Sequence, residues 1–195
     1  MSDDEDTELP EGWFKIDGIQ EGKWTLKNRL TGLGVLANQQ ADILDVGCAE
    51  GLIGEWLMNR GNATLHGLER HGPFIERARS LMRNYPETRV RFFQVDLNYI
   101  QAWLDLNPNA LRPHYGIVLC LLVLHKVTHP EIVLKLLADR VARYLALHLP
   151  NPVINDPRSS NQPFDTKAWL LDNGFRVIAD DTAGDFSRLI YQRNK

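Results

Sequence analysis

This chain of 195 residues has few of the features that define several large classes of protein. It contains only two cysteines, too few for a disulfide framework or for a four-cysteine zinc site. Its longest apolar run, residues 116–124, falls far short of the roughly 20 residues that a membrane helix needs. Its net charge of −3 indicates no surface dedicated to a polyanion. The composition therefore favours a globular protein without a membrane span, and nucleic acid is not an expected partner.

The N-terminal segment, residues 1–12, is acidic and has no apolar period. Its six acidic side chains predict a disordered tail, whereas residues 13–195 are expected to form one domain with a single sizeable core. An acidic start is the opposite of a secretory or mitochondrial presequence, so the expected location is the cytoplasm. There, Cys48 and Cys120 are expected to be buried and reduced, with a redox pair as the alternative.

Strand and helix patterns alternate along most of the chain. Apolar residues recur at helical spacing over residues 26–37 and predict one helix ahead of the first strand. Five apolar segments then predict strands separated by amphipathic helices, at residues 42–46, 63–68, 90–95, 115–122 and 143–149. The C-terminal part adds a polar loop, a helix and two strands, at residues 150–163, 165–174, 175–179 and 188–192. This alternation predicts an α/β fold with a mostly parallel sheet and helices on both faces.

The most informative segment is residues 43–51, which read Ile-Leu-Asp-Val-Gly-Cys-Ala-Glu-Gly. It joins an apolar strand to an amphipathic helix through Gly47 and Gly51. Glycine lets the backbone approach a ligand without a Cβ clash, and a helix start offers unpaired N–H groups. Residues 45–51 resemble the first motif of the class I S-adenosylmethionine (SAM) methyltransferases, in its form D-x-G-C-x-x-G.

The resemblance to this family implies a fold, a cofactor and a set of binding residues. The fold is a Rossmann-like three-layer sandwich, whose seven-stranded, mostly parallel sheet has the order 3-2-1-4-5-7-6. The cofactor is SAM, and S-adenosylhomocysteine is the product. The binding residues of the first motif are Asp45, Gly47, Cys48 and Gly51. Asp45 would hold the ammonium side of the cofactor, with a turn-capping role as the alternative.

Further positions implied by the resemblance follow the second and third predicted strands. Glu69 can accept the ribose hydroxyls, and Arg70 stands where many family members have an apolar residue against the adenine. Asp96 and Leu97 match the position that meets the adenine amino group and ring, although Asp96 also suits an ordinary helix cap. These residues are expected to bind the nucleoside part of the cofactor.

The ends of the fourth and fifth predicted strands carry the remaining candidates. Cys120 and Leu121 match the family position whose main chain meets the cofactor ammonium. His125 and His148 are candidate catalytic residues, because a histidine can remove a proton from an acceptor near neutral pH. A hydrogen-bonded structural histidine is the alternative for each. His125 and His129 are four positions apart, but a helix is expected to begin only at the second, so no metal site is predicted.

The acceptor is narrowed by motifs that the chain lacks. No Asp/Asn-Pro-Pro-aromatic segment and no Pro-Cys pair follows the fourth strand, which weighs against amino-directed nucleic-acid methylation and cytosine C5 methylation. The expected acceptor is a small molecule or a glycan-like group, held by segments around residues 13–24, 124–130 and 150–163. Trp13, Phe14 and Trp24 would either close over the sulfonium as a lid or pack the first helix on the sheet.

Two other functions compete with methyl transfer on the sequence alone. Gly47, Gly51 and Gly54 with Glu69 imitate the fingerprint of a nicotinamide-dependent oxidoreductase, although the tight G-x-G step is missing. A non-catalytic subunit of the SAM-binding fold would bind cofactor and serve a partner protein without turnover. The order of affinities for SAM and NAD, and the presence of turnover, separate the three functions.

Overall fold

The structure of the protein is a computed structural model that describes residues 14–15, 24–150, 165–182 and 186–194. Two expectations lie outside these residues: the acidic tail at residues 1–12, and the expected loop at 150–163 beyond its first residue. The side chains of Trp13, Phe14 and Trp24 are also outside the description, so the expected lid stays a prediction.

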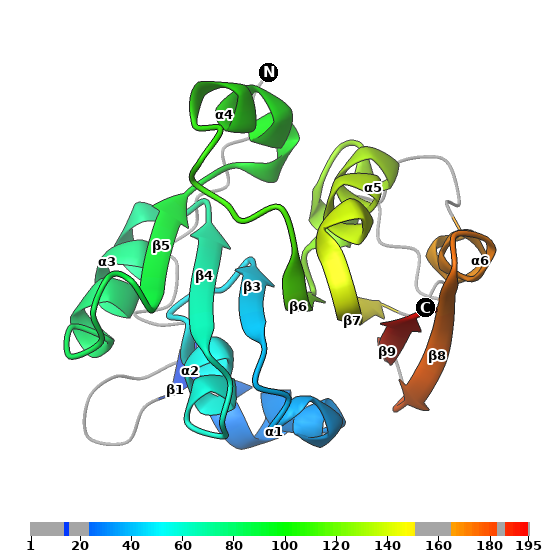
Figure 1. Cartoon of the computed structure of the whole chain (residues 1–195), viewed down its shortest axis with the longest axis horizontal. Coiled ribbons are helices and arrows are strands. Elements are labelled where there is room, and N and C mark those ends of the chain that lie inside the picture. The colour runs from blue at the N-terminus through cyan, green and yellow to red at the C-terminus, as the bar shows by residue number, and fades with distance from the viewer. Residues whose placement is uncertain (1–13, 16–23, 151–164, 183–185, 195) are drawn as a thin grey trace.

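The core of the molecule is one seven-stranded sheet (Figure 1). Its strands are β3 (Asp42–Val46), β4 (Thr64–Glu69), β5 (Val90–Gln94), β6 (Tyr115–Leu121), β7 (Val141–Pro150), β8 (Phe175–Asp180) and β9 (Phe186–Arg193). They lie in the order β5-β4-β3-β6-β7-β9-β8, and β9 runs antiparallel between β7 and β8. The other neighbouring pairs are parallel. This order confirms the predicted 3-2-1-4-5-7-6 arrangement.

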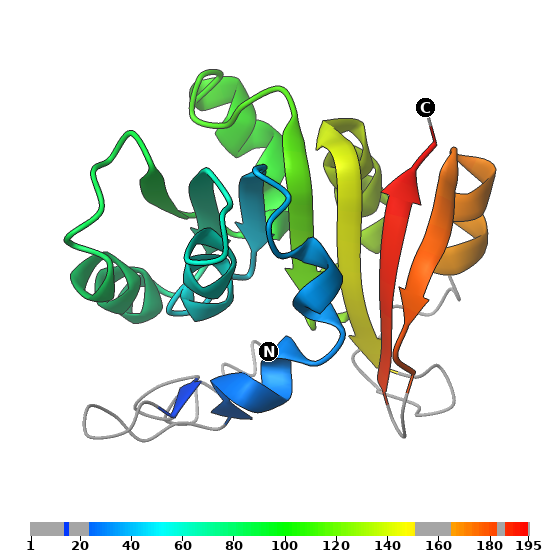
Figure 2. The same cartoon turned by 60° about the horizontal axis from the view of Figure 1, so that its bottom comes forward.

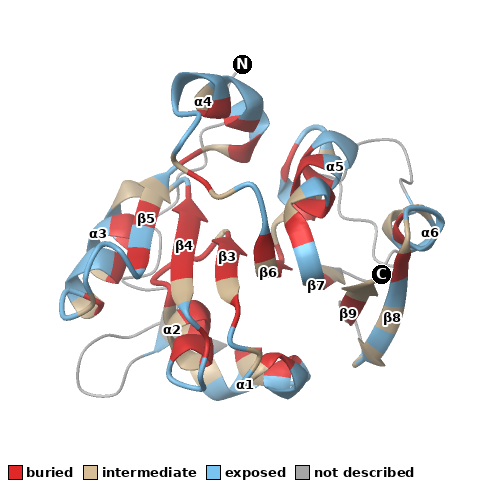
Figure 3. Cartoon of the chain, viewed as in Figure 1, coloured by how far each residue is buried: buried red, intermediate tan, exposed pale blue. Residues whose placement is uncertain are grey.

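Helices cover both faces of the sheet, as Figure 2 shows from a second direction. They are α2 (Leu52–Met58), α3 (Gly72–Leu81), α4 (Ile100–Leu106), α5 (Pro130–Arg140) and α6 (Thr166–Asp172), with short 3-10 turns η2 (Leu97–Tyr99) and η3 (Leu124–Lys126). One hydrophobic core lies beneath α4, α5 and α6, and a second lies beneath α2 and α3. Figure 3 shows the buried residues concentrated on the strands and the inner helix faces. The expected three-layer sandwich is therefore present.

The N-terminal part differs from the single helix expected over residues 26–37. The structure has a short helix α1 (Leu26–Leu30) and a separate 3-10 turn η1 (Leu33–Leu36). Gly32 between them has a φ of 77°, which lies in the left-handed region and ends the helix. Ahead of α1, the two-residue strands β1 (Phe14–Lys15) and β2 (Trp24–Thr25) pair in parallel.

The alternation of side chains along β3 determines which of them pack in each of the two hydrophobic cores. Ile43 packs in the core beneath α2 and α3, whereas Leu44 and Val46 pack in the opposite core. Asp45 shares the face of Ile43, because successive side chains of a strand point to opposite sides. Its neighbour across the β3–β4 pair is Gly67, where a Cβ would clash with Phe92 and Cys48. Gly67 thus lets the Phe92 and Cys48 side chains pack closely against β4 beside the buried carboxylate.

No helix among the described residues is long and apolar enough to cross a membrane. Cys48 and Cys120 are both free and buried, as expected from the sequence. Burial raises the pKa of the Cys48 thiol well above its usual range and that of Cys120 to about 12. Both sulfurs are therefore protonated near neutral pH, which disfavours a redox role because the thiolate is the reactive form.

Candidate active site

The chain makes a tight bend where β3 ends and α2 begins. Gly47, Ala49 and Gly51 have φ values of 71°, 47° and 75°. The Gly47 N–H donates to the Leu68 carbonyl at 2.8 Å, which ties the bend to the end of β4. A Cβ on Gly47 would overlap the Val123 side chain, so only glycine fits this bend. The two motif glycines are thus required by the backbone geometry itself.

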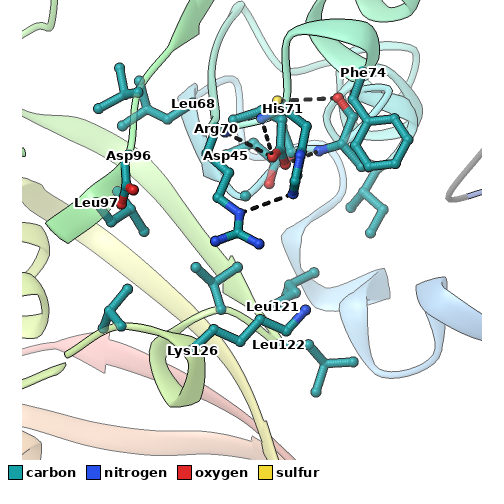
Figure 4. A pocket seen from close by; sticks show the side chains of 18 of the residues that line it. Asp45, Leu68, Arg70, His71, Phe74, Asp96, Leu97, Leu121, Leu122 and Lys126 are labelled. Carbon is teal, nitrogen blue, oxygen red and sulfur yellow. Dashed lines mark hydrogen bonds between the residues drawn. The ribbon is translucent and has the colours of Figure 1, made fainter. Parts of the chain in front are cut away.

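A cavity of about 200 Å³ opens at the carboxyl ends of β3, β4, β5 and β6 (Figure 4). It is lined by eight of the ten residues expected to bind the cofactor: Asp45, Gly47, Cys48, Glu69, Arg70, Asp96, Leu97 and Leu121. The other two, Gly51 and Cys120, are buried behind its wall and do not line it. The structure therefore brings together residues that are up to 76 positions apart in the sequence, from Asp45 to Leu121.

Glu69 connects two of the segments that line this cavity. Its Oε2 accepts the Ala49 N–H at 3.2 Å, and its Oε1 accepts the N–H groups of Arg70 at 2.8 Å and His71 at 3.0 Å. The carboxylate is buried and faces the cavity. It therefore holds the bend after β3 against the loop after β4, a role that the sequence did not reveal.

Asp45 is a buried carboxylate with unused hydrogen-bonding capacity. It is only 3% exposed, and its Oδ2 has no hydrogen-bond partner among the described residues. Burial, and then the charge of Glu69, raise the pKa of Asp45 to about 7, while Arg29 and the Gly54 backbone oppose this shift. A buried acceptor of this kind is costly unless a donor meets it, so the site is suited to a cationic ligand group.

The far side of the cavity comes from the ends of β5 and β6. The Asp96 carboxylate accepts the Asn98 N–H at 2.9 Å through Oδ1. It therefore caps η2, which is the alternative role that the sequence analysis gave for this residue. It also lines the cavity beside Leu97. Leu122, another lining residue, has a φ of 61°, which is unusual for a branched side chain. Backbone strain of this kind often occurs at binding sites, where the surrounding structure holds it.

The sequence reasoning missed Arg29, which lines the cavity from α1 and is only 4% exposed. Its Nη1 lies 3.2 Å from Nδ1 of His148, and since a guanidinium only donates, His148 accepts this hydrogen bond. Burial, and then the charge of Arg188, lower the pKa of Arg29 to about 10, so it stays charged. One signal was available: Arg29 lies on the apolar face of the predicted helix, together with Leu26, Leu30 and Leu33.

The two candidate catalytic histidines do not line the cavity. His148 is 5% exposed and bonded to Arg29, and burial, followed by the charges of Arg29, Arg188 and His125, lowers its pKa to about 3. Its imidazole is therefore neutral and a weak base. His125 lies in η3, one residue before Lys126, which does line the cavity. A catalytic role stays a prediction for both, and the contacts of His148 favour the structural alternative.

Comparison with known proteins identifies the family to which this chain belongs. The family described as "Methyltransferase domain" matches residues 43–146, more than half of the chain. No curated protein matches the chain. The family match supports methyl transfer over the nicotinamide-dependent alternative and over a subunit without catalytic function.

Several solved structures share the fold. A putative SAM-dependent methyltransferase from Listeria monocytogenes is 14% identical, with a TM-score of 0.63, over 80% of this chain and 92% of that one. Magnesium protoporphyrin IX methyltransferase from Synechocystis, with bound SAM, is 21% identical, with a TM-score of 0.60, over 86% and 76%. The bifunctional kinase-methyltransferase WbdD is 20% identical, with a TM-score of 0.71, over 96% of this chain but 44% of its own. The chain thus belongs to the methyltransferase domain family, and its fold is that of the SAM-dependent methyltransferases.

Proposed function

We propose that the cavity binds SAM and that the protein transfers its methyl group to a small-molecule acceptor. The observation that carries this proposal is the set of charged groups at one edge of the sheet. Three carboxylates, those of Asp45, Glu69 and Asp96, line the cavity together with the guanidinium of Arg29. SAM presents an ammonium, a carboxylate, a ribose diol and an adenine, and each finds a group of complementary chemistry here.

The amino-acid end of SAM is a zwitterion, and the cavity offers one group of each sign. The unpartnered Oδ2 of Asp45 would accept the cofactor ammonium, and this contact would favour the ionised carboxylate. Arg29 would donate to the cofactor carboxylate. Arg29 and Asp45 line the same cavity, so the two ends of one amino acid could each meet a group of opposite charge there. The main chain at Leu121 would complete this subsite.

Glu69 is proposed to meet the ribose. A carboxylate has about four lone-pair sites, and three of them already accept N–H groups of Ala49, Arg70 and His71. One ribose hydroxyl can therefore bind without disturbing the bend, whereas accepting both hydroxyls requires one backbone bond to open. This limits the bidentate contact expected from the sequence.

The adenine is proposed to lie near Asp96 and Leu97. One Asp96 oxygen caps η2, which leaves the other to accept the adenine amino group, while the Leu97 N–H would donate to the ring. Arg70 bounds the cavity where an apolar residue is usual. Its Nε donates to Nε2 of His71 at 3.0 Å (Figure 4), which holds the guanidinium at the cavity wall. A guanidinium can stack on a purine ring, so this departure is compatible with adenine binding.

The chemistry supplied by SAM is an electrophilic methyl group on a sulfonium. The residues of this chain orient the cofactor, exclude water and align the acceptor, and most of the rate gain is expected from this positioning. His125 is the remaining candidate for removing a proton from an acceptor. We propose a small-molecule or glycan-like acceptor, in keeping with the magnesium protoporphyrin IX methyltransferase among the similar structures.

Calorimetric titration of the protein with S-adenosylhomocysteine and with NAD tests the proposal. We expect S-adenosylhomocysteine to bind and NAD to give no signal. A screen of small-molecule acceptors with labelled SAM, run on wild type and on Glu69→Gln, then tests turnover. Binding of NAD in preference to S-adenosylhomocysteine would contradict the proposal, since it would assign the cavity to a different cofactor.

A further inference from the structure

A second hollow, of about 440 Å³, lies near the amino ends of the strands, whereas the cofactor cavity lies at their carboxyl ends. It is formed where β4 and β5 begin, together with the loop that precedes β6. Its floor is His66, and its polar walls include Arg91, Arg112, Asn109 and Glu87. No residue is shared with the cofactor cavity, so this hollow is a separate feature of the surface.

The Tyr115 hydroxyl is the hydrogen-bond partner of His66. This hydroxyl accepts the Arg112 N–H at 2.9 Å and lies 2.7 Å from Nδ1 of His66. When the hydroxyl donates to Nδ1, the neutral imidazole carries its proton on Nε2. His66 is 94% buried, being 6% exposed, and Nε2 has no hydrogen bond to another described residue. In that tautomer the ring offers an Nε2–H donor to the hollow that it lines.

The residues that line the hollow include two positive charges, Arg91 and Arg112, and one negative charge, Glu87. Burial, and then the charges of Arg112 and Arg91, lower the pKa of His66 to about 4, whereas Asp42 opposes this shift. Arg112 Nη1 pairs with Asp42 at 2.5 Å, and the guanidinium has further N–H donors. Arg91 packs its guanidinium over the Phe93 ring at 4.9 Å. An oxyanion in the hollow could therefore meet guanidinium donors from two of the side chains that line it.

We propose that this hollow binds a phosphate-type oxyanion, through the guanidinium groups of Arg91 and Arg112 and the Nε2–H of His66. Arginine suits this ligand because its N–H groups match the spacing of phosphate oxygens. A water molecule occupies roughly 30 Å³ in the liquid, so the hollow has room for more than one phosphate group. The ligand is either free phosphate or the phosphorylated end of a larger small molecule.

Titration of the full chain with inorganic phosphate at pH 7, at constant ionic strength, tests this assignment. The imidazole nitrogen signals of His66, followed by NMR, report occupancy without any measurement of methyl transfer. We expect saturable shifts with a dissociation constant in the millimolar range, and a pKa of His66 that rises on saturation because an anion favours the imidazolium. Glycerol 1-phosphate that binds tighter than phosphate would identify a phosphorylated molecule as the source.

Arg91→Gln should weaken phosphate binding at least fivefold, whereas Arg91→Lys should retain an intermediate affinity because the charge remains. Arg83→Gln is the matched control, since Arg83 is exposed and lies outside the hollow. Unchanged S-adenosylhomocysteine binding by each variant shows that the fold is intact. The proposal is overturned if the His66 shifts are linear in phosphate, if Arg83→Gln weakens them equally, or if a divalent cation binds there instead through Glu87.

Discussion

The Glu69 carboxylate and the Ala49 N–H are hydrogen-bonded at 3.2 Å, which joins the end of β4 to the bend after β3. The two residues are twenty positions apart, and β3 and β4, which precede them in the chain or contain them, are neighbouring strands. The same carboxylate that is proposed to meet the ribose therefore also fixes the backbone that the cofactor approaches. Substitutions at Glu69 act on both functions at once.

Glu69→Gln is expected to weaken S-adenosylhomocysteine binding by about 1–3 kcal/mol, because it removes charge-assisted hydrogen bonds. Its amide nitrogen would also face a backbone donor, so some loss of stability should accompany the change. Calorimetry on wild type and variant gives the affinity, and urea unfolding gives the stability. Glu76→Gln, on the exposed face of α3, is the control and should alter neither quantity. An unchanged affinity would remove Glu69 from the ribose site.

Gly47→Ala is expected to destabilise the protein and to abolish cofactor binding. The new Cβ would overlap Val123, and a φ of 71° costs a non-glycine residue roughly 1–3 kcal/mol. Gly34→Ala is the control, because its φ is not positive and nothing lies within 4 Å of its Cβ. The double variant with Val123→Ala should recover part of the stability. Full recovery of the stability would show that the positive φ at position 47 adds no cost beyond the clash with Val123.

Arg29→Gln is expected to weaken S-adenosylhomocysteine at least tenfold and to leave 5′-methylthioadenosine unaffected, because only the former has a carboxylate. His148→Phe should act in the same direction, since it removes the acceptor that holds Arg29 Nη1. Competition binding with the two nucleosides measures both effects. Equal losses for both ligands would indicate general damage to the cavity and would count against the assigned carboxylate contact.

The raised pKa of the Asp45 carboxyl makes the free energy of unfolding depend on pH, and it fixes the sign of that dependence. The folded protein keeps a proton up to about pH 7, whereas the unfolded chain loses it near the ordinary value of 3.8. The free energy of unfolding should therefore fall as pH rises between these values, by an amount on the order of a few kcal/mol, and stay level above them. Urea unfolding of wild type and Asp45→Asn measures this, because the variant lacks the dependence.

Cofactor binding should then release a proton from Asp45 near pH 6.5, because the cofactor ammonium favours the carboxylate. Calorimetry in buffers of different ionisation enthalpy measures the number of protons released. Asp45→Asn should show a smaller release, and identical values for the two proteins would contradict the assigned contact.

Much of the fold was predictable because local and global signals agree. The limits of β3 match the predicted strand at 42–46. β6 begins at Tyr115 as expected, since an uninterrupted apolar run marks a buried parallel strand. The expected helix over 26–37 was wrong because Thr31 and Gly32 end the first turns, although the apolar spacing continues past them. Periodicity alone did not reveal the left-handed residue.

The candidate site was likewise predictable only in part from the sequence. Asp45, Glu69 and Asp96 were identifiable because the chain resembles the methyltransferase family at or near the ends of three predicted strands, and parallel strands bring such ends to one edge. The pairing of Arg29 with His148 was not identifiable, since 119 positions separate them and no local pattern links α1 to β7. The low pKa of His148 follows from that contact and from burial, so its basicity was also beyond the sequence.

The late strand β9 supports the N-terminal segment from which Arg29 reaches the cavity. Arg188 Nη1 donates to the Thr31 carbonyl and to Asp181 Oδ2, and Ile190 belongs to the same core as Leu33. Mutations in β9 should accordingly impair ligand recognition at a distance, although no described residue of that strand borders the cavity. Inherited or engineered substitutions in β9 would weaken ligand binding by displacing the segment that carries Arg29, and not by removing a direct contact with the ligand.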